Sequence, residues 1–192
     1  AVTVAKAAGA AKILVTDVDP RRLEIARELG ADEAYSASDP DWVKHARTAT
    51  QNQGPHVLLE MSGHAQAISG GFTALRNGGT VALLGLPSRP VEMDLPNDII
   101  FKGATVLGIN GRRMFETWYQ MENFLLAGQL NLEPIITDEI PLAEFETGFK
   151  RMQSGEAIKV ILQVPHQERP SCLTIPTASD VSTSAPAEYS TS

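Results

Sequence analysis

The sequence predicts an α/β protein built on a doubly wound parallel sheet, and three observations lead to this prediction. Strand-like and helix-like segments alternate along residues 1–164. The strand-like segments are short runs that are apolar on both faces, which is typical of a parallel sheet covered by helices on both sides. Turn residues such as Gly, Pro, Asp and Asn bound these segments.

The first half of the chain has the most regular alternation. The short apolar or β-prone runs expected to be strands span residues 12–16, 33–36, 56–61 and 80–85. The helices expected between them span residues 20–29, 41–51 and 65–75. Asp19 is the expected N-cap of the first of these helices, Pro20 occupies its first position, and Gly30 is placed to terminate it.

Beyond Pro87 the alternation continues less regularly. Strands are expected over residues 104–109 and 158–164, and helices over residues 114–127 and 141–154. Both helices carry large apolar side chains at helical spacing, which predicts that these side chains belong to the core. They are Phe115, Trp118, Met121, Phe124 and Leu125 in the first helix, and Phe145, Phe149 and Met152 in the second.

Three parts are expected along the chain. Residues 1–130 should form the α/β domain, and residues 131–164 a C-terminal helix and strand. Residues 165–192 are rich in Ser, Thr and Pro without apolar periodicity, which predicts a disordered tail. Because the chain begins without Met, in what resembles the middle of a helix, we expect it to be a piece of a longer protein.

Composition excludes several classes of protein. Of the 192 residues, 43% are hydrophobic and 20% charged, which is enough apolar material for a packed core, and no apolar run is long enough to span a membrane. The net charge of −7, without a dense basic cluster, argues against nucleic acid or an anionic membrane as partner. A single cysteine, Cys172, excludes a disulfide or multi-cysteine zinc site within the chain and favours a reducing compartment.

Asp17 is the most informative candidate for a binding residue. It follows an apolar strand, and ligands of open α/β sheets bind at the carboxyl ends of the strands. A carboxylate there can hold both ribose hydroxyls of an adenosine and repel a 2′-phosphate, which favours NAD over NADP. Arg22 is placed to lie over the adenine or to pair with Asp17. A capping or solvated role for Asp17, and a solvated helix position for Arg22, are the alternatives.

Two glycines at other strand ends, Gly63 and Gly85, would let the backbone approach a flat ring closely, although both fit ordinary turns as well. The glycine-rich turn that usually grips a pyrophosphate is missing, because no G-x-G-x-x-G occurs. The strand that should precede it is also missing. Since this strand normally lies at the centre of the sheet, we expect a gap between the strands at 12–16 and 56–61.

Metal and nucleophile sites find little support in the sequence. The histidines are not spaced as metal ligands, and no Cys or Glu completes a coordination shell. Ser62-Gly63-His64 invites a hydrolase interpretation, but no G-x-S-x-G elbow frames the serine. We therefore predict neither a metal ligand nor a catalytic residue in this chain.

Several motifs together resemble the zinc-dependent medium-chain dehydrogenases. They lie at residues 15–18, 22–26, 59–63 and 85–87. The more specific run Gly-Arg-Arg-Met-Phe-Glu-Thr-Trp-Tyr at 111–119, with the segment 99–103, narrows the resemblance to the L-threonine 3-dehydrogenases within that family. Segments 134–137 and 155–162 continue the resemblance, which covers about residues 1–164.

This resemblance implies a Rossmann-like NAD-binding domain, truncated before its first strand and glycine-rich loop. It implies an enzyme that oxidises the 3-hydroxyl of L-threonine, passing hydride to NAD⁺ and forming 2-amino-3-oxobutanoate, in a cytoplasmic homotetramer. It places Asp17 at the adenosine ribose and Arg22 beside the adenine. The residues that it places near the nicotinamide half of the cofactor are Leu84, Gly85, Leu86, Ile109 and Asn110.

The chain also departs from the family pattern. The family's zinc ligands, proton relay and pyrophosphate loop belong to a region without a counterpart here, so we expect no turnover of threonine by this chain alone. Asp138 stands where the family usually has His. Two alternatives stay open: another zinc-type alcohol or polyol dehydrogenase, and a non-catalytic nucleotide-binding or oligomerisation module. In each dehydrogenase case the partner is a small-molecule substrate, with no nucleic acid or membrane involved.

Overall fold

The computed structural model of the chain describes residues 1–165 and forms two compact units. The first unit spans residues 1–137, and the second begins at Asp138. The sequence places a boundary after residue 130 instead, and the roles that it assigns to the parts stay predictions. The predicted disordered tail, with Cys172, lies outside the described residues apart from Pro165.

The first unit alternates helices and strands as the sequence predicts. Its elements are α1 (Val2–Ala7), β1 (Leu14–Asp17), α2 (Pro20–Glu28), β2 (Glu33–Ser36), α3 (Trp42–Ala49), β3 (Val57–Glu60), α4 (Ala65–Ala74), β4 (Thr80–Leu83), a π-helical turn (Pro96–Ile100), β5 (Thr105–Gly108), α5 (Glu116–Leu126) and a 3₁₀ turn (Glu133–Ile135). The π-helical turn is the element that the sequence analysis did not anticipate before β5. Most of the predicted strands extend one or two residues too far, as is usual for element ends.

All strand pairs of the first unit are parallel, and they form two separate sheets. One sheet pairs β1 with β2, and the other has the order β3-β4-β5. The break between β1 and β3 confirms the predicted gap in the doubly wound sheet. Within residues 1–165, β1 and β3 are each bonded to a strand on one side only, so part of the backbone of each lacks a strand partner.

Local sequence signals explain α2 and how it covers the β1–β2 sheet. The Oδ1 atom of Asp19 accepts a hydrogen bond from the main-chain N–H of Arg21 at 2.9 Å, which caps the helix and lowers the pKa of the Asp19 carboxyl. Gly30 follows the helix with φ +103°, a conformation that glycine adopts without strain. Leu23 and Ala26 are buried on the inner face, and Ala26 packs with Ile13.

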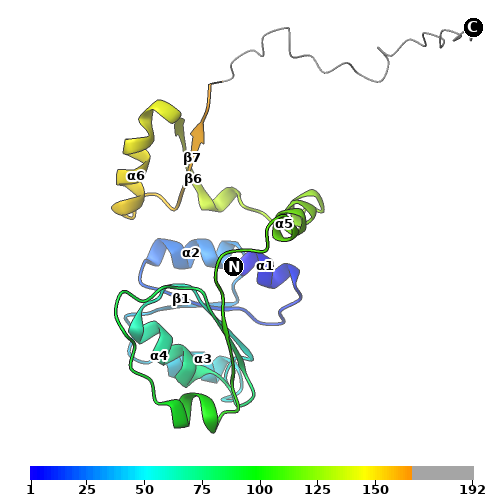
Figure 1. Cartoon of the computed structure of the whole chain (residues 1–192), viewed down its shortest axis with the longest axis vertical. Coiled ribbons are helices and arrows are strands. Elements are labelled where there is room, and N and C mark those ends of the chain that lie inside the picture. The colour runs from blue at the N-terminus through cyan, green and yellow to red at the C-terminus, as the bar shows by residue number, and fades with distance from the viewer. Residues whose placement is uncertain (166–192) are drawn as a thin grey trace, which may run out of the picture. The chain divides into compact units, whose positions relative to one another are not determined.

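Helix α4 packs on the β3-β4-β5 sheet. It also lies against α3 (Figure 1). Phe72 and Leu75 at its C-terminal end pack with Val81 of β4, and all three are fully buried. The ammonium group of Lys102 donates hydrogen bonds to the carbonyls of Phe72, Thr73 (3.2 Å) and Leu75 (2.9 Å) at this helix end. Partial burial lowers the pKa of Lys102, and the carbonyls supply acceptors for its charge.

The prediction that the large apolar side chains of α5 belong to the core is wrong. No residue of α5 is buried; Trp118, for example, is 50% exposed. On the β3-β4-β5 sheet, Val57, Leu59 and Leu107 also stay exposed, so this face lacks a covering layer. The spacing correctly indicates an amphipathic helix, but burial requires an opposing surface, and residues 1–165 do not provide one.

The second unit contains β6 (Ile136–Pro141, which begins at the end of the first unit), a 3₁₀ turn (Leu142–Glu144), α6 (Phe145–Gln153) and β7 (Lys159–Gln163). Strands β6 and β7 pair, and α6 packs on them at Gly148, where an added Cβ would lie 2.9 Å from Ile140 Cδ1. Arg151 pairs with Asp138 at 2.8 Å, and the Asp138 side chain is 8% exposed.

Two expectations for the second unit fail. Strand β6 was missed because Asp138 and Glu139 interrupt its apolar residues. The apolar residues that share the α6 face, Phe145, Phe149 and Met152, are exposed rather than in the core. Among residues 1–165, no helix combines the length and the apolar character needed to cross a membrane.

We predict that this chain alone is at best marginally stable, with a free energy of unfolding of about 5 kcal/mol or less, the lower end of the usual range. The reason is that its sheet is split and large apolar surfaces stay in water. Urea unfolding followed by circular dichroism measures this quantity. A sharp cooperative transition with a clearly larger free energy would contradict the prediction.

Candidate functional site

The predicted binding residues lie at the carboxyl ends of parallel strands. Asp17 is the last residue of β1, and Arg22 is in the first turn of α2. The segment 84–86 follows β4, and the segment 109–110 follows β5. Because neighbouring parallel strands end at the same edge of a sheet, 84–86 and 109–110 share one edge of the β3-β4-β5 sheet.

The Asp17 carboxylate is partly exposed and oriented by its own turn. Its Oδ1 atom accepts a hydrogen bond from the main-chain N–H of Asp19 at 2.9 Å. The guanidinium of Arg22 lies 4.0 Å from Asp17 Oδ2 and 3.9 Å from Asp19 Oδ2. The Asp17 side chain keeps 29% of its surface exposed, and a carboxylate can accept more hydrogen bonds than the one from Asp19. Both alternatives for Arg22, pairing with Asp17 and lying over an adenine, are compatible with this placement.

Main-chain hydrogen bonds position the segments after β4 and β5. The N–H of Leu84 donates to the Glu60 carbonyl at 2.8 Å, and the N–H of Ile109 donates to the Leu83 carbonyl at 2.9 Å. Both apolar side chains are about two-fifths exposed, and Leu86 is 92% exposed. An exposed apolar edge of this kind is suited to a flat, partly apolar ring.

The structure therefore places the predicted binding residues in two groups on two different sheets. Asp17 and Arg22 belong to the β1–β2 sheet and α2, whereas Leu84, Gly85, Leu86, Ile109 and Asn110 belong to the β3-β4-β5 sheet. That both groups bind one cofactor stays a prediction.

Gly63 and Gly85 are explained by a close contact between two loops. A Cβ added to Gly63, which has φ +67°, would lie 2.6 Å from the Leu86 carbonyl oxygen. A Cβ added to Gly85 would collide with the main-chain N of Gly63 and lie 2.7 Å from the Ser62 carbonyl carbon. The loops after β3 and β4 thus touch backbone to backbone, which requires glycine whether or not a ring is bound.

Glu60 is the residue at this edge that the sequence analysis did not single out. It is the last residue of β3, and it is buried with 4% of its surface exposed. Its position after an apolar run, two residues before Ser62 and three before Gly63, is the signal that could have found it. A carboxylate at such a place can accept the N–H groups of a tight turn.

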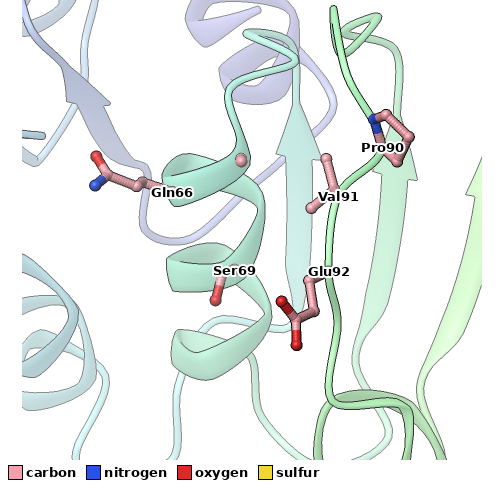
Figure 2. Close-up of a pocket in the computed structure, with 6 residues that line it drawn as sticks. Gln66, Ser69, Pro90, Val91 and Glu92 are labelled. Atoms are coloured by element: carbon pink, nitrogen blue, oxygen red, sulfur yellow. The ribbon is translucent and has the colours of Figure 1, made fainter.

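A cavity of about 370 Å³ lies elsewhere, between α4 and the segment 90–92 (Figure 2). Its lining consists of Ala65, Gln66, Ser69, Pro90, Val91 and Glu92. None of the predicted binding residues lines this cavity, so the sequence-based site and the cavity are separate features.

Comparison with known proteins identifies the family to which this chain belongs. The protein family described as "Zinc-binding dehydrogenase" matches residues 1–127. The chain belongs to this family. An L-threonine 3-dehydrogenase from Bacillus velezensis is 48% identical over 162 residues, covering 84% of this chain and 47% of that protein. The chain thus spans about half the length of the curated relatives it matches.

Solved structures of zinc-type dehydrogenases share the fold. An alcohol dehydrogenase zinc-binding domain protein from Burkholderia ambifaria superimposes with a TM-score of 0.78 at 31% identity, over 86% of this chain and 45% of that one. A 2R,3R-butanediol dehydrogenase from Bacillus subtilis gives 0.76 at 25% identity, over 84% of this chain and 46% of that one. The predicted resemblance and the α/β fold are thereby confirmed.

The family's name implies a zinc ion, but the side chains of residues 1–165 do not form a site that fits one. Within residues 1–165, no group of three or more His, Cys, Asp or Glu side chains is placed to hold a metal. Protein zinc sites take three or four such ligands.

The contact at Gly85 predicts a mutation series. Gly85→Ala should lower the free energy of unfolding by about 1–3 kcal/mol, because the backbone of residues 62–63 must move away from the new methyl group. Gly108→Ala is the matched control, since Gly108 ends the neighbouring strand and has open space around its Cα. Equal stability of the two variants in urea unfolding would contradict the proposed loop contact.

Proposed function

We propose that this chain forms the NAD-binding part of a cytoplasmic dehydrogenase that oxidises L-threonine to 2-amino-3-oxobutanoate. The observation that carries the proposal is the partly exposed carboxylate of Asp17 at the carboxyl end of β1, with Arg22 beside it. The similarity to L-threonine 3-dehydrogenases over 84% of the chain supports the choice of reaction.

In this proposal Asp17 accepts hydrogen bonds from the adenosine ribose, and its negative charge disfavours the 2′-phosphate of NADP. Arg22 lies beside the adenine. The exposed edge formed by Leu84, Gly85, Leu86, Ile109 and Asn110 receives the nicotinamide half. In this proposal the chain's own residues bind and orient the cofactor, and no group of three or more His, Cys, Asp or Glu side chains among residues 1–165 is placed to hold a metal.

We propose L-threonine rather than another alcohol as the substrate for two reasons. These are the sequence run at 111–119 and the similarity to threonine dehydrogenases. Another zinc-type alcohol or polyol dehydrogenase is the alternative, since a butanediol dehydrogenase shares the fold. In either case the substrate is a small molecule, and neither nucleic acid nor a membrane takes part.

A second candidate function is favoured by the exposed apolar residues of α5 and by the open edge of β5. Trp118 and Tyr119 of α5 and its N-cap residue Phe115 are at least half exposed, and all of β5 is accessible. Large exposed apolar patches are typical of protein–protein contacts. We propose that these elements contribute to a homo-oligomer, which would be the main role of the chain if it did not bind nucleotide.

The cofactor proposal predicts the effect of Asp17→Asn. Losing a hydrogen bond to a charged group costs about 1.5–3 kcal/mol, so the Kd for NADH should rise about 10- to 100-fold. The Kd for NADPH should change less, because repulsion of its phosphate is lost at the same time. Fluorescence titration of the chain measures both, and Glu24→Gln on exposed α2 surface is the charge-matched control. Equal effects of the two substitutions would refute the assignment of Asp17.

Turnover provides a separate test. With L-threonine and NAD⁺, this chain alone should form no NADH. Zinc-type alcohol oxidation needs a metal that lowers the pKa of the alcohol, and residues 1–165 contain no group of three or more side chains placed to hold one. Absorbance at the NADH band measures the reaction, with the complete relative from Bacillus velezensis as positive control. Threonine-dependent NADH formation by a sample free of host enzyme would show the prediction to be wrong.

A further inference from the structure

Glu60 is a buried carboxylate held by its own loop. Only 4% of its surface is exposed, and acidic side chains are rarely buried so completely without compensating partners. No Lys, Arg or His of residues 1–165 lies within ion-pairing distance of it. Its compensation comes instead from N–H and O–H groups of the residues that follow it.

Three donors converge on this carboxylate. Oε1 accepts hydrogen bonds from the main-chain N–H of Ser62 (2.9 Å), the Ser62 hydroxyl (2.6 Å) and the N–H of Gly63 (3.1 Å). Oε2 lies 3.1 Å from the same Gly63 nitrogen. Hydrogen bonds to an ionised acceptor are stronger than neutral ones, so the carboxylate holds the backbone of Ser62 and Gly63 in one conformation.

The main chain of Glu60 holds the neighbouring loop as well. Its carbonyl accepts hydrogen bonds from the N–H groups of Leu84 (2.8 Å) and Gly85 (3.2 Å). A single residue therefore ties both loops, the side chain to its own loop and the carbonyl to the loop after β4. The Gly63–Gly85 contact described above leaves little space for one loop to move without the other.

We propose that Glu60 is a positioning residue for the nicotinamide half of the cofactor. Its carboxylate keeps residues 62–63 pressed against residues 85–86, so that the segment 84–86 presents a preformed edge to the ring. This inference rests on the proposed cofactor function. It goes further by assigning control of that edge to a residue that does not itself touch the ligand. A preformed edge improves binding, because less conformational entropy is lost when the cofactor binds.

The test compares two ligands on the full chain. NADH carries both halves of the cofactor, whereas ADP-ribose carries the adenosine half without nicotinamide. In Glu60→Gln, an NH₂ group replaces one carboxylate oxygen and faces a hydrogen-bond donor of the turn instead of accepting from it. The lost hydrogen bond loosens the turn. We expect the Kd for NADH to rise about tenfold, the Kd for ADP-ribose to stay unchanged, and the change in nicotinamide fluorescence on binding to shrink.

Two further variants keep the test decisive. Glu28→Gln is the matched control, because Glu28 is exposed at the end of α2, away from the carboxyl ends of the strands, and should behave like wild type. Ser62→Ala removes the 2.6 Å hydrogen bond but keeps the carboxylate, so it should give a smaller change in the same direction and replaces Glu60→Gln if that variant fails to fold. Amide exchange of Gly63 without cofactor should quicken in the order wild type, Ser62→Ala, Glu60→Gln.

The outcomes separate this inference from the proposed function. If wild type binds neither ligand, the proposed function fails and this inference fails with it. If wild type binds both and the Glu60 and Ser62 variants weaken them equally, the residue supports the fold only, and the inference alone is overturned. An unchanged Kd for NADH in these variants overturns it as well.

Discussion

The edge of the β3-β4-β5 sheet depends on the parallel register of β3 and β4. Glu60 faces Leu83 at the end of that register, and its carbonyl then accepts the N–H groups of both Leu84 and Gly85. This pairing sets the direction in which both loops leave the sheet. The loops that leave these two adjacent strands touch through their backbones at Gly63 and Gly85, where a side chain would not fit. The shape of the candidate site therefore depends on this main-chain geometry and on the Glu60 carboxylate that holds residues 62–63.

The two sheets of the first unit carry different parts of the candidate site. The β1–β2 sheet carries a charged group, Asp17 with Arg22, which is suited to a sugar and its base. The β3-β4-β5 sheet carries an exposed apolar edge, which is suited to a flat ring. This division matches the two halves of a dinucleotide in the proposed function. The exposed apolar surface of α5 fits the proposed contacts between subunits.

The sequence predicted most of the fold because the relevant signals are local. Asp19 and Pro20 start α2, Gly30 ends it, and short apolar runs mark the strands of the first unit. The gap that divides the strands of the first unit into two sheets was predicted as well. Strand β6 was not predicted because its charged residues interrupt the apolar periodicity. Its pairing with β7 depends on residues about twenty positions further along the chain.

The sequence by itself determined the fold class, the family and the candidate residues Asp17 and Gly85, since motifs and turn residues act over a few positions. Only the tertiary structure decided which apolar residues are buried: Trp118 and Phe149 lie on amphipathic helices yet stay exposed. It also decided that Glu60 is buried and joins two loops. Burial and loop contact depend on surfaces that approach from distant parts of the chain, and hydrophobic periodicity carries no information about whether such a surface is present.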